Sequence, residues 1–389
     1  MLHSEYARYA RRLIPENGRE PGVRVTGLEC PESGSRMVED SSVVDVFCGV
    51  GGLTHGFVLE GFRVVAGIDA DKACEYAYEK NNCGSKFINK RVEDVTAAEI
   101  LALFPEGHIK ILVGCAPCQP YSPYTKKRRD SGQRWRLFAK FARLVCDVKP
   151  DLVSMENVPE LATSRNGRLY RGVLNRLRRE GYCVSEYRHI YCPDYGIPQQ
   201  RTRLVVFASR YGEVQIAPST HTPDDYVGVR QAIGHLSPLK AGEGDGEDRL
   251  HKAARLSELN LKRIRASVPG GTWRDWPQEL VAQCHRKETG KGYASVYGRM
   301  AWDEPAPTLT AQCYGFGNGR FGHPEQDRAI SLREAALLQT FPRDYEFLAA
   351  GDPVPFKALG RLIGNAVPVD LGRVIAKSIR AHLEAQSID

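Results

Sequence analysis

The chain has 389 residues, of which 42% are hydrophobic and 26% charged, enough for one large globular domain and a smaller one. Its formal net charge of +7 is a mild positive excess that suits a nucleic-acid partner without proving one. Eleven scattered cysteines fit a reducing cytoplasm better than a disulfide framework, and no apolar run has the length of a signal peptide or a membrane span, so we expect a cytoplasmic protein without a membrane.

The first regular segment combines a strand, a glycine-rich turn and a helix. Residues 1–41 show little periodicity and are expected to be an N-terminal extension to which we assign no function. Residues 43–47 are apolar except for Asp45, as in a buried parallel strand, and lead through a glycine-rich stretch at 48–52 into a helical segment at 53–60. In this arrangement the backbone approaches a cofactor, and a helix N-terminus faces its negative group.

Two acidic residues follow that could serve such a cofactor. Asp69 ends a second predicted strand at 62–68, where a carboxylate is placed to hydrogen-bond ribose hydroxyls. With the glycine turn it predicts a nucleoside-containing cofactor, without saying which one. Asp94 is a further candidate, but it could equally be the N-cap of a predicted helix at 97–103.

The most distinctive stretch surrounds Cys118. An apolar run at 109–113 predicts a buried strand, and the two prolines that bracket Cys118 place this residue on a stiff loop after it. Nine basic and two acidic residues follow between 126 and 149, so the thiol is a candidate nucleophile for an anionic target. Cys115 and Cys118 could instead be half a zinc site, a redox dithiol or buried structural cysteines. No second metal-binding pair completes the set, and we predict no metal.

Polar residues also end the next strand. The elements predicted here are a helix at 134–148, a strand at 150–155, a helix striped by Leu169, Val173 and Leu177, and strands near 183–190 and 204–208. Glu156 and Asn157 follow the first of these strands. Arg201 and Arg203 alternate along the extended entry to the last one and therefore share a face.

The alternation of strands and helices predicts an α/β fold with a doubly wound, mostly parallel sheet. Ligands of such sheets bind beyond the carboxyl ends of the strands. The Gly49 turn, Asp69, Cys118 and Glu156 all fall at that edge, and this convergence predicts an enzyme.

From residue 211 the periodicity weakens and basic and aromatic loops predict a smaller, loop-rich domain. Those loops could contact nucleic acid, or could be an ordinary solvated surface. Ser331 and Glu334 form a capping-box pattern before a helix at 331–339, and the last helix is expected at about 370–383. We therefore divide the chain into an extension at 1–41, a catalytic and cofactor-binding domain at 42–210, a recognition domain at 211–350 and a C-terminal segment at 351–389.

Together these segments resemble the DNA cytosine methyltransferases that modify the ring 5-position, of the bacterial or phage type. The similarity runs from Val43 to about Val369, with the motifs in the family's order. The similar stretches are Asp45 to Gly52 (the cofactor motif), Gly114 to Ser122 (the Pro-Cys motif), Glu156-Asn157-Val158, Gln199 to Arg203, Arg333-Glu334 with Leu338 to Pro342, and Gly364 to Val367. Tyr121 and Ala366 depart from the residues that the family often has there, at positions without a bond-making role.

The resemblance implies S-adenosylmethionine as methyl donor, S-adenosylhomocysteine as product, and a Rossmann-like fold whose C-terminal segment returns to the catalytic domain. It places around the cofactor Asp45, Phe47, Gly49, Gly51, Asp69, Asp94, Pro117, Asn365 and Val367. Phe47 alone would otherwise be taken for core packing.

The resemblance also implies the catalytic roles. Cys118 would attack cytosine C6, and Glu156 would donate or share a proton at N3. Arg203, with Arg201, would contact the base carbonyl or hold Glu156, while Asn157 would hold the loop. The substrate would be double-stranded DNA with the cytosine flipped out.

The implied enzyme is a monomer, either an orphan methylase or one with a cognate restriction endonuclease acting separately. Thr308 to Thr310 lies where the family often has a Thr-Leu or Thr-Ile pair that supports its recognition loops. Three alternatives remain: an RNA methyltransferase, although Cys313-Tyr314-Gly315 does not match that branch's Cys-Phe-Thr; a dinucleotide-dependent oxidoreductase, supported only by the glycine turn and Asp69; and a silent DNA-binding homologue.

Overall fold

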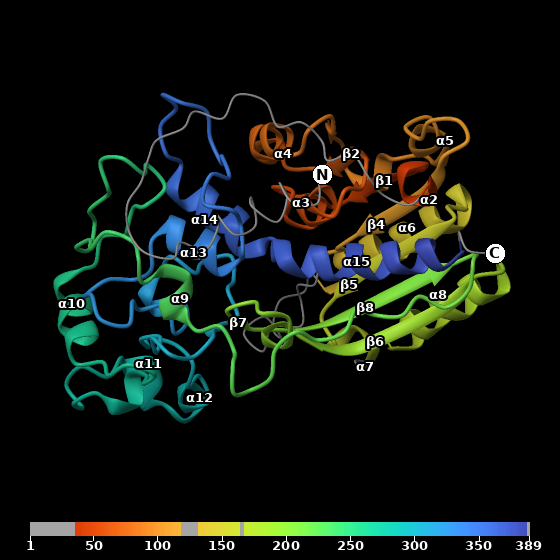
Figure 1. Ribbon diagram of the computed structural model, residues 1–389. Coiled ribbons are helices and arrows are strands. Elements are labelled where there is room, and N and C mark those ends of the chain that lie inside the picture. Colours follow the sequence, from red (N-terminus) through yellow and green to blue (C-terminus); the bar gives the residue numbers. More distant parts are fainter. Residues whose placement is uncertain (1–35, 118–130, 164–166, 387–389) are drawn as a thin grey trace.

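A seven-stranded sheet forms the centre of the larger part of the protein (Figure 1). The computed structural model describes residues 36–117, 131–163 and 167–386. The sheet strands, in spatial order, are β3 (Lys86–Asn89), β2 (Val64–Asp69), β1 (Ser41–Val46), β4 (Ile109–Gly114), β5 (Leu152–Asn157), β8 (Thr202–Ser209) and β6 (Cys183–Tyr191). The first five are parallel, and β8 runs antiparallel to both of its neighbours. The predicted mostly parallel α/β sheet is confirmed.

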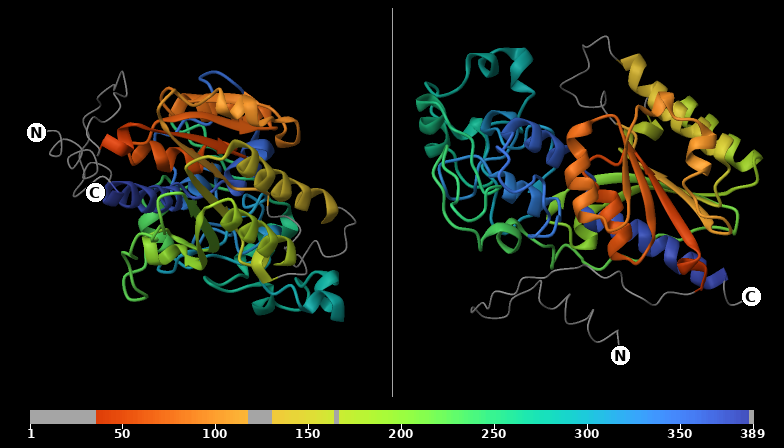
Figure 2. Two further views of the ribbon diagram at one scale, coloured as in Figure 1. Left: turned by 90° about the vertical axis from the view of Figure 1, so that its right-hand side faces the viewer. Right: turned by 90° about the horizontal axis from the view of Figure 1, so that it is seen from above.

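Helices cover both faces of this sheet, and Figure 2 shows them as separate layers. The helices of this part are α2 (Arg36–Glu39), α3 (Gly52–Leu59), α4 (Glu75–Asn81), α5 (Ala97–Leu101), α6 (Ser131–Val148), α7 (Glu160–Thr163), α8 (Gly167–Arg179) and α15 (Val369–Gln386). On one face α6 and α8 bury Phe141, Leu144 and Leu174, and on the other α3 and α15 bury Phe57 and Ile375. None of the helices in the described residues is both long and apolar enough to cross a membrane.

The buried face of α8 differs from the predicted stripe. Leu169 is 39% exposed, whereas Tyr170 is fully buried together with Leu174 and Leu177. The Tyr170 hydroxyl donates a hydrogen bond to Glu186 on β6, which turns this position toward the sheet. The prediction was therefore wrong for Leu169, because a tyrosine with a polar partner can be buried in place of a leucine.

Helices α3 and α15 approach each other at glycines. A Cβ atom on Gly56 of α3 would lie 2.5 Å from the carbonyl carbon of Gly372 on α15, and one on Gly372 would lie 2.9 Å from the Leu53 oxygen. The same approach brings the Val367 oxygen to within 2.2 Å of where a Gly52 Cβ would be. The C-terminal segment therefore packs directly, backbone to backbone, on the glycine turn, as the resemblance implied.

The second part is rich in loops and lies beside the sheet (Figure 1). Its elements are α9 (Val229–Ile233), α10 (Glu258–Arg265), α11 (Gln283–Arg286), α12 (Glu288–Lys291), α13 (Leu332–Leu338), α14 (Phe356–Asn365) and β9 (Ala306–Pro307), which pairs with β7 (Gln199–Gln200). One core joins α13 and α14 to Tyr78 of α4, and a smaller core contains Trp273 and Trp276. Ser331 and Glu334 form the predicted capping box of α13. The residue boundaries of the domains stay a prediction.

Replacing Gly56 with alanine tests the close approach of α3 and α15. We expect a loss of about 1–3 kcal/mol of unfolding free energy, because the new methyl group must push backbone atoms apart. The matched control is Gly172→Ala in α8, where a Cβ meets nothing within 4 Å and the helix should gain about 0.5–1 kcal/mol. Thermal and urea unfolding of both variants and the wild type would measure these changes. A Gly56→Ala variant as stable as the wild type would contradict the expectation.

Candidate active site

The carboxyl ends of four neighbouring strands meet at one edge of the sheet. Val46 lies beside both Ile68 and Gly114, and Gly114 lies beside Met155. The residues that come next on these strands are Asp69 (β2), Phe47 (β1), Cys115 (β4) and Glu156 (β5). The predicted convergence of the Gly49 turn, Asp69 and Glu156 is therefore present, and Cys118, three residues after Cys115, lies outside the described residues.

The turn after β1 has an unusual backbone that Asp69 holds in place. Phe47, Gly49 and Gly51 have φ angles of 69°, 53° and 89°, in the left-handed region. The Gly49 N–H donates to Asp69 Oδ2 at 3.0 Å, and the Asp71 N–H donates to Asp69 Oδ1 at 2.8 Å. A Cβ on Gly49 would meet nothing within 4 Å, so the backbone faces open space there. Phe47 is half-buried against the core, and its left-handed conformation marks a strained position.

Asp45 lies beneath this turn. It is fully buried, and Thr54 Oγ1 donates a hydrogen bond of 2.7 Å to its Oδ2. Burial raises the pKa of Asp45 to about 7, against the hydrogen bond from Thr54. Its Oδ1 has no hydrogen-bond partner among the described residues, so the carboxyl is incompletely compensated.

The other predicted cofactor residues differ in their burial. Val367 is buried against Gly52, while Asn365 is exposed at the end of α14 and Pro117 is exposed after β4. Asp94 is exposed as well, at the end of a 3-10 turn. The alternative that Asp94 caps the next helix is wrong, because Thr96 caps α5 in a capping box with Glu99.

Glu156 is held from two sides. Its side chain is only 1% exposed, and Arg203 Nε on β8 lies 2.8 Å from Oε1. This contact is an ion pair, since Oε1 has no hydrogen-bond donor among the described residues. The Cys115 thiol donates to the second oxygen, Oε2, at 2.6 Å. A buried carboxylate is stable when an opposite charge compensates it, which the Arg203 guanidinium does.

Asn157 and Arg201 make contacts with the neighbouring loops. Asn157 Nδ2 donates to the Ala116 carbonyl oxygen at 3.0 Å, which ties the end of β5 to the loop that leads into Cys118. Arg201 is buried, and its guanidinium donates to Gln199 Oε1 and to the Ala366 carbonyl oxygen at 3.3 and 3.5 Å. Arg201 thus reaches the loop that carries Asn365 and Val367.

Two buried glutamines, which lie inside recognised motifs but were not predicted as site residues, join the two parts of the protein. Gln199 Nε2 donates to Gln339 Oε1 at 2.9 Å, while Gln199 Oε1 accepts from the Leu309 N–H at 3.0 Å. Gln339 Nε2 in turn donates to the Ile363 oxygen at 2.9 Å. Beside them, Thr308 Oγ1 donates to the Gln200 oxygen. Gln199 stood inside a recognised motif, but nothing in its local sequence indicates which distant groups its amide meets.

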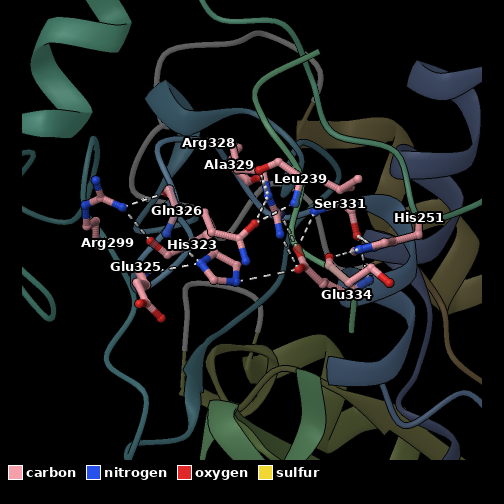
Figure 3. Close-up of polar contacts among 11 residues, drawn as sticks. Leu239, His251, Arg299, His323, Glu325, Gln326, Arg328, Ala329, Ser331 and Glu334 are labelled. Atoms are coloured by element: carbon pink, nitrogen blue, oxygen red, sulfur yellow. Dashed lines mark hydrogen bonds and ion pairs between the residues drawn. The ribbon is translucent and has the colours of Figure 1, made fainter. Parts of the chain in front are cut away.

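The second part contains a buried polar network around Arg328 and Glu334 (Figure 3). Arg328 is fully buried and binds Glu334 through two hydrogen bonds of 2.7 Å each, to Oε1 and Oε2. Although burial opposes ionisation, Arg328 lowers the pKa of Glu334. Glu334 also accepts from the Ser331 N–H at 2.6 Å. Such bidentate pairs are strong and directional, and this one fixes the start of α13.

His323 completes this network as a neutral ring. Its Nδ1 accepts hydrogen bonds from the N–H groups of Glu325 and Gln326, at 3.2 and 2.9 Å, so it has no room for a proton (Figure 3). Burial, with the nearby charges of Arg328 and Arg299, lowers the pKa of His323 to about 4, although Glu334 opposes this shift.

The described residues contain no group of three or more His, Cys, Asp or Glu side chains that could hold a metal ion.

A mostly parallel sheet with a glycine turn, an acidic second-strand end and a buried carboxyl at one edge defines the class of Rossmann-like enzymes that bind a nucleoside cofactor. Comparison with known proteins narrows this class. Residues 41–381 match the family model of the C-5 cytosine-specific DNA methylases. The chain belongs to this family.

Individual relatives agree. The chain is 58% identical over 343 residues to the type II methylase M.HgiDII of Herpetosiphon aurantiacus, covering 88% of this chain and 96% of that protein. It is 30% identical over 366 residues to the type II methyltransferase M.PspPI of a Psychrobacter strain, covering 92% and 84%.

A solved structure described as a putative DNA modification methyltransferase encoded within an Escherichia coli prophage has a TM-score of 0.67 at 22% identity, covering 88% and 99% of the two chains. This likeness supports the fold. The protein is thus a DNA (cytosine-5-)-methyltransferase, and the oxidoreductase alternative is excluded.

The stability of the wild-type protein should fall more steeply with acid than that of His323→Gln. Because the pKa of His323 is lowered from 6.5 to about 4, the unfolded chain takes up its proton first as the pH falls. Stability is therefore lost between about pH 6.5 and pH 4, by about 3 kcal/mol at most at this one group. Glutamine can still accept an N–H hydrogen bond but does not titrate.

The measurement is the thermal midpoint of each protein between pH 7.5 and pH 4.5, with the exposed His189→Gln as control. His189→Gln should follow the wild type. Parallel curves for the wild type and His323→Gln would show that His323 carries none of the acid sensitivity.

Proposed function

We propose that this methyltransferase is the modification enzyme of a type II restriction–modification system, which methylates a flipped-out cytosine in a short sequence of double-stranded DNA through a covalent adduct of Cys118. The observation that carries the proposal is the buried Glu156–Arg203 pair at the strand edge, beside the loop that leads into Cys118. The two type II relatives support the biological setting.

The turn after β1 fits S-adenosylmethionine. The open side of Gly49 lets an adenosine group approach the backbone, and the partly exposed Asp69 carboxylate keeps lone pairs for ribose hydroxyls. Phe47, Gly51, Asp94, Pro117, Asn365 and Val367 would complete the cradle, above the buried Asp45. Bound there, the cofactor supplies an electrophilic methyl group and leaves as S-adenosylhomocysteine.

In the proposed reaction, the protein's own side chains activate the cytosine ring and transfer a proton to it. The Cys118 thiolate adds to cytosine C6, which moves an electron pair toward C5 and N3. Glu156 provides the proton at N3, and Arg203 keeps that carboxyl in place. After C5 has accepted the methyl group, C5 loses its proton to a base, the S–C6 bond breaks to release the Cys118 thiolate, and N3 returns its proton to Glu156. The base must leave the stack for the thiol to reach C6.

Asn157 and Arg201 act as supports in this scheme. Asn157 fixes Ala116, and with it the start of the Cys118 loop, relative to Glu156. Arg201 donates hydrogen bonds to Gln199 and Ala366, and so connects the segment that enters β8 to the loop before Val367 in the proposed cofactor site. We place the enzyme in the cytoplasm as a monomer that acts independently of a cognate endonuclease.

Methylation-sensitive sequencing of plasmid DNA from cells that express the protein tests the reaction and its target together. Wild type should modify cytosines in one short sequence context, and Cys118→Ala should modify none. Glu156→Gln should lower the rate about 10²- to 10⁴-fold, since it removes the proton donor. Titration calorimetry with S-adenosylhomocysteine is the control, because both variants should still bind it.

The covalent step has a separate measurement. DNA with 5-fluorocytosine at the mapped position lacks the C5 proton whose loss frees the cysteine, so wild type should form a stable adduct visible by mass spectrometry. Cys118→Ala should form none. Methylated cytosine without any trapped adduct would contradict the proposed nucleophile, and unmodified DNA from a folded, cofactor-binding protein would overturn the proposed reaction.

A further inference from the structure

Cys115 is the half of the Cys115-x-x-Cys118 pair that the proposed mechanism leaves unused. It follows β4 directly, and because Gly114 pairs with Met155, it stands level with Glu156 on β5. Met155 belongs to the core on the α6 side, and a Cβ on Gly114 would lie 3.0 Å from Phe141 of α6. Side chains alternate along a strand, so Cys115 and Glu156 both point to the opposite face.

The thiol and the guanidinium contact different oxygens of the Glu156 carboxyl. Cys115 Sγ lies 2.6 Å from Oε2, and Arg203 Nε lies 2.8 Å from Oε1. The two groups come from β4 and β8, which flank β5 on either side. Arg203 is itself anchored, because its Nη1 donates to the Thr202 oxygen at 2.7 Å. Rotation of the carboxyl about its last bond is therefore opposed at both ends.

A thiol is suited to this position by the weakness of its hydrogen bond. Glu156 must offer one carboxyl oxygen to the cytosine ring, and a strong permanent donor on Oε2 would compete with the base. An S–H group is a weak donor. It can hold the carboxyl before the base arrives and then give up the contact.

We propose that Cys115 is a positioning residue that holds Glu156 in the orientation needed at cytosine N3. This inference rests on the proposed function, in which Glu156 supplies that proton. It gives Cys115 a role that requires neither a metal nor a disulfide with Cys118.

The test compares Cys115→Ala with Cys115→Ser in steady-state and single-turnover methylation of the mapped DNA sequence. Alanine should lower kcat about 10- to 100-fold through loss of orientation, with unchanged KM for DNA and cofactor. Serine keeps a donor at this position and should recover part of kcat but not all of it, because a hydroxyl is a stronger donor than a thiol and competes with the base. Cys146→Ala, which removes a buried thiol from α6, is the control for packing and should change the melting temperature but not kcat.

Two outcomes would overturn the inference alone: an active wild type whose Cys115→Ala variant keeps the full kcat, or a Cys115→Ser variant as slow as Cys115→Ala. An inactive wild type, or a Glu156→Gln variant with full activity, would instead remove the proposed function and this inference with it. A loss that is largest for Cys115→Ala, with unchanged KM and partial rescue by serine, supports the positioning role, which a purely structural cysteine would not show.

Discussion

The direct backbone contact between α3 and α15 is the constraint on which the active edge depends. The glycines at 52, 56 and 372 let the start and the end of the described chain meet without side chains between them. This contact places the Val367 loop against the turn after β1, and the Val369 N–H donates to the Gln339 oxygen at the start of α15. One close approach therefore sets the turn after β1, the Val367 loop against it and the residue that joins the second part.

The second part is attached to the catalytic sheet by directional contacts as well as by a shared apolar core. The buried Gln199–Gln339 amide pair lies on one side, and on the other the buried Tyr345 hydroxyl donates to the Val50 oxygen in the turn after β1. At the surface, Tyr76 of α4 also donates to Glu346 at 2.7 Å. Because hydrogen bonds specify angles and distances, whereas apolar contacts tolerate sliding, these contacts orient the loops of the second part relative to the edge that holds Glu156.

The sequence was sufficient for the sheet and its active edge, since apolar runs followed by polar residues mark the ends of buried parallel strands. It failed where the partner is distant or where two local signals compete. Thr96 caps α5 in place of Asp94, and Tyr170 replaces Leu169 on the buried face of α8. Glu334 was predictable as part of a capping box, but its pairing with Arg328 depends on how the chain folds just before α13, which the capping pattern does not specify. The contact between Cys115 and Glu156 requires the β4–β5 register, which no local pattern encodes.

The two groups that hold Glu156 differ in what their loss would do. Without Arg203, a carboxylate that is only 1% exposed would lie buried without its counter-charge, which costs about 3–5 kcal/mol in comparable ion pairs. Without the Cys115 thiol, the charge stays compensated and only one weak hydrogen bond disappears. Arg203 therefore makes the burial of Glu156 tolerable, and the thiol selects among its orientations. In the proposed mechanism, separating these tasks allows a carboxyl to be buried in the protein and still turn toward a base that enters from outside.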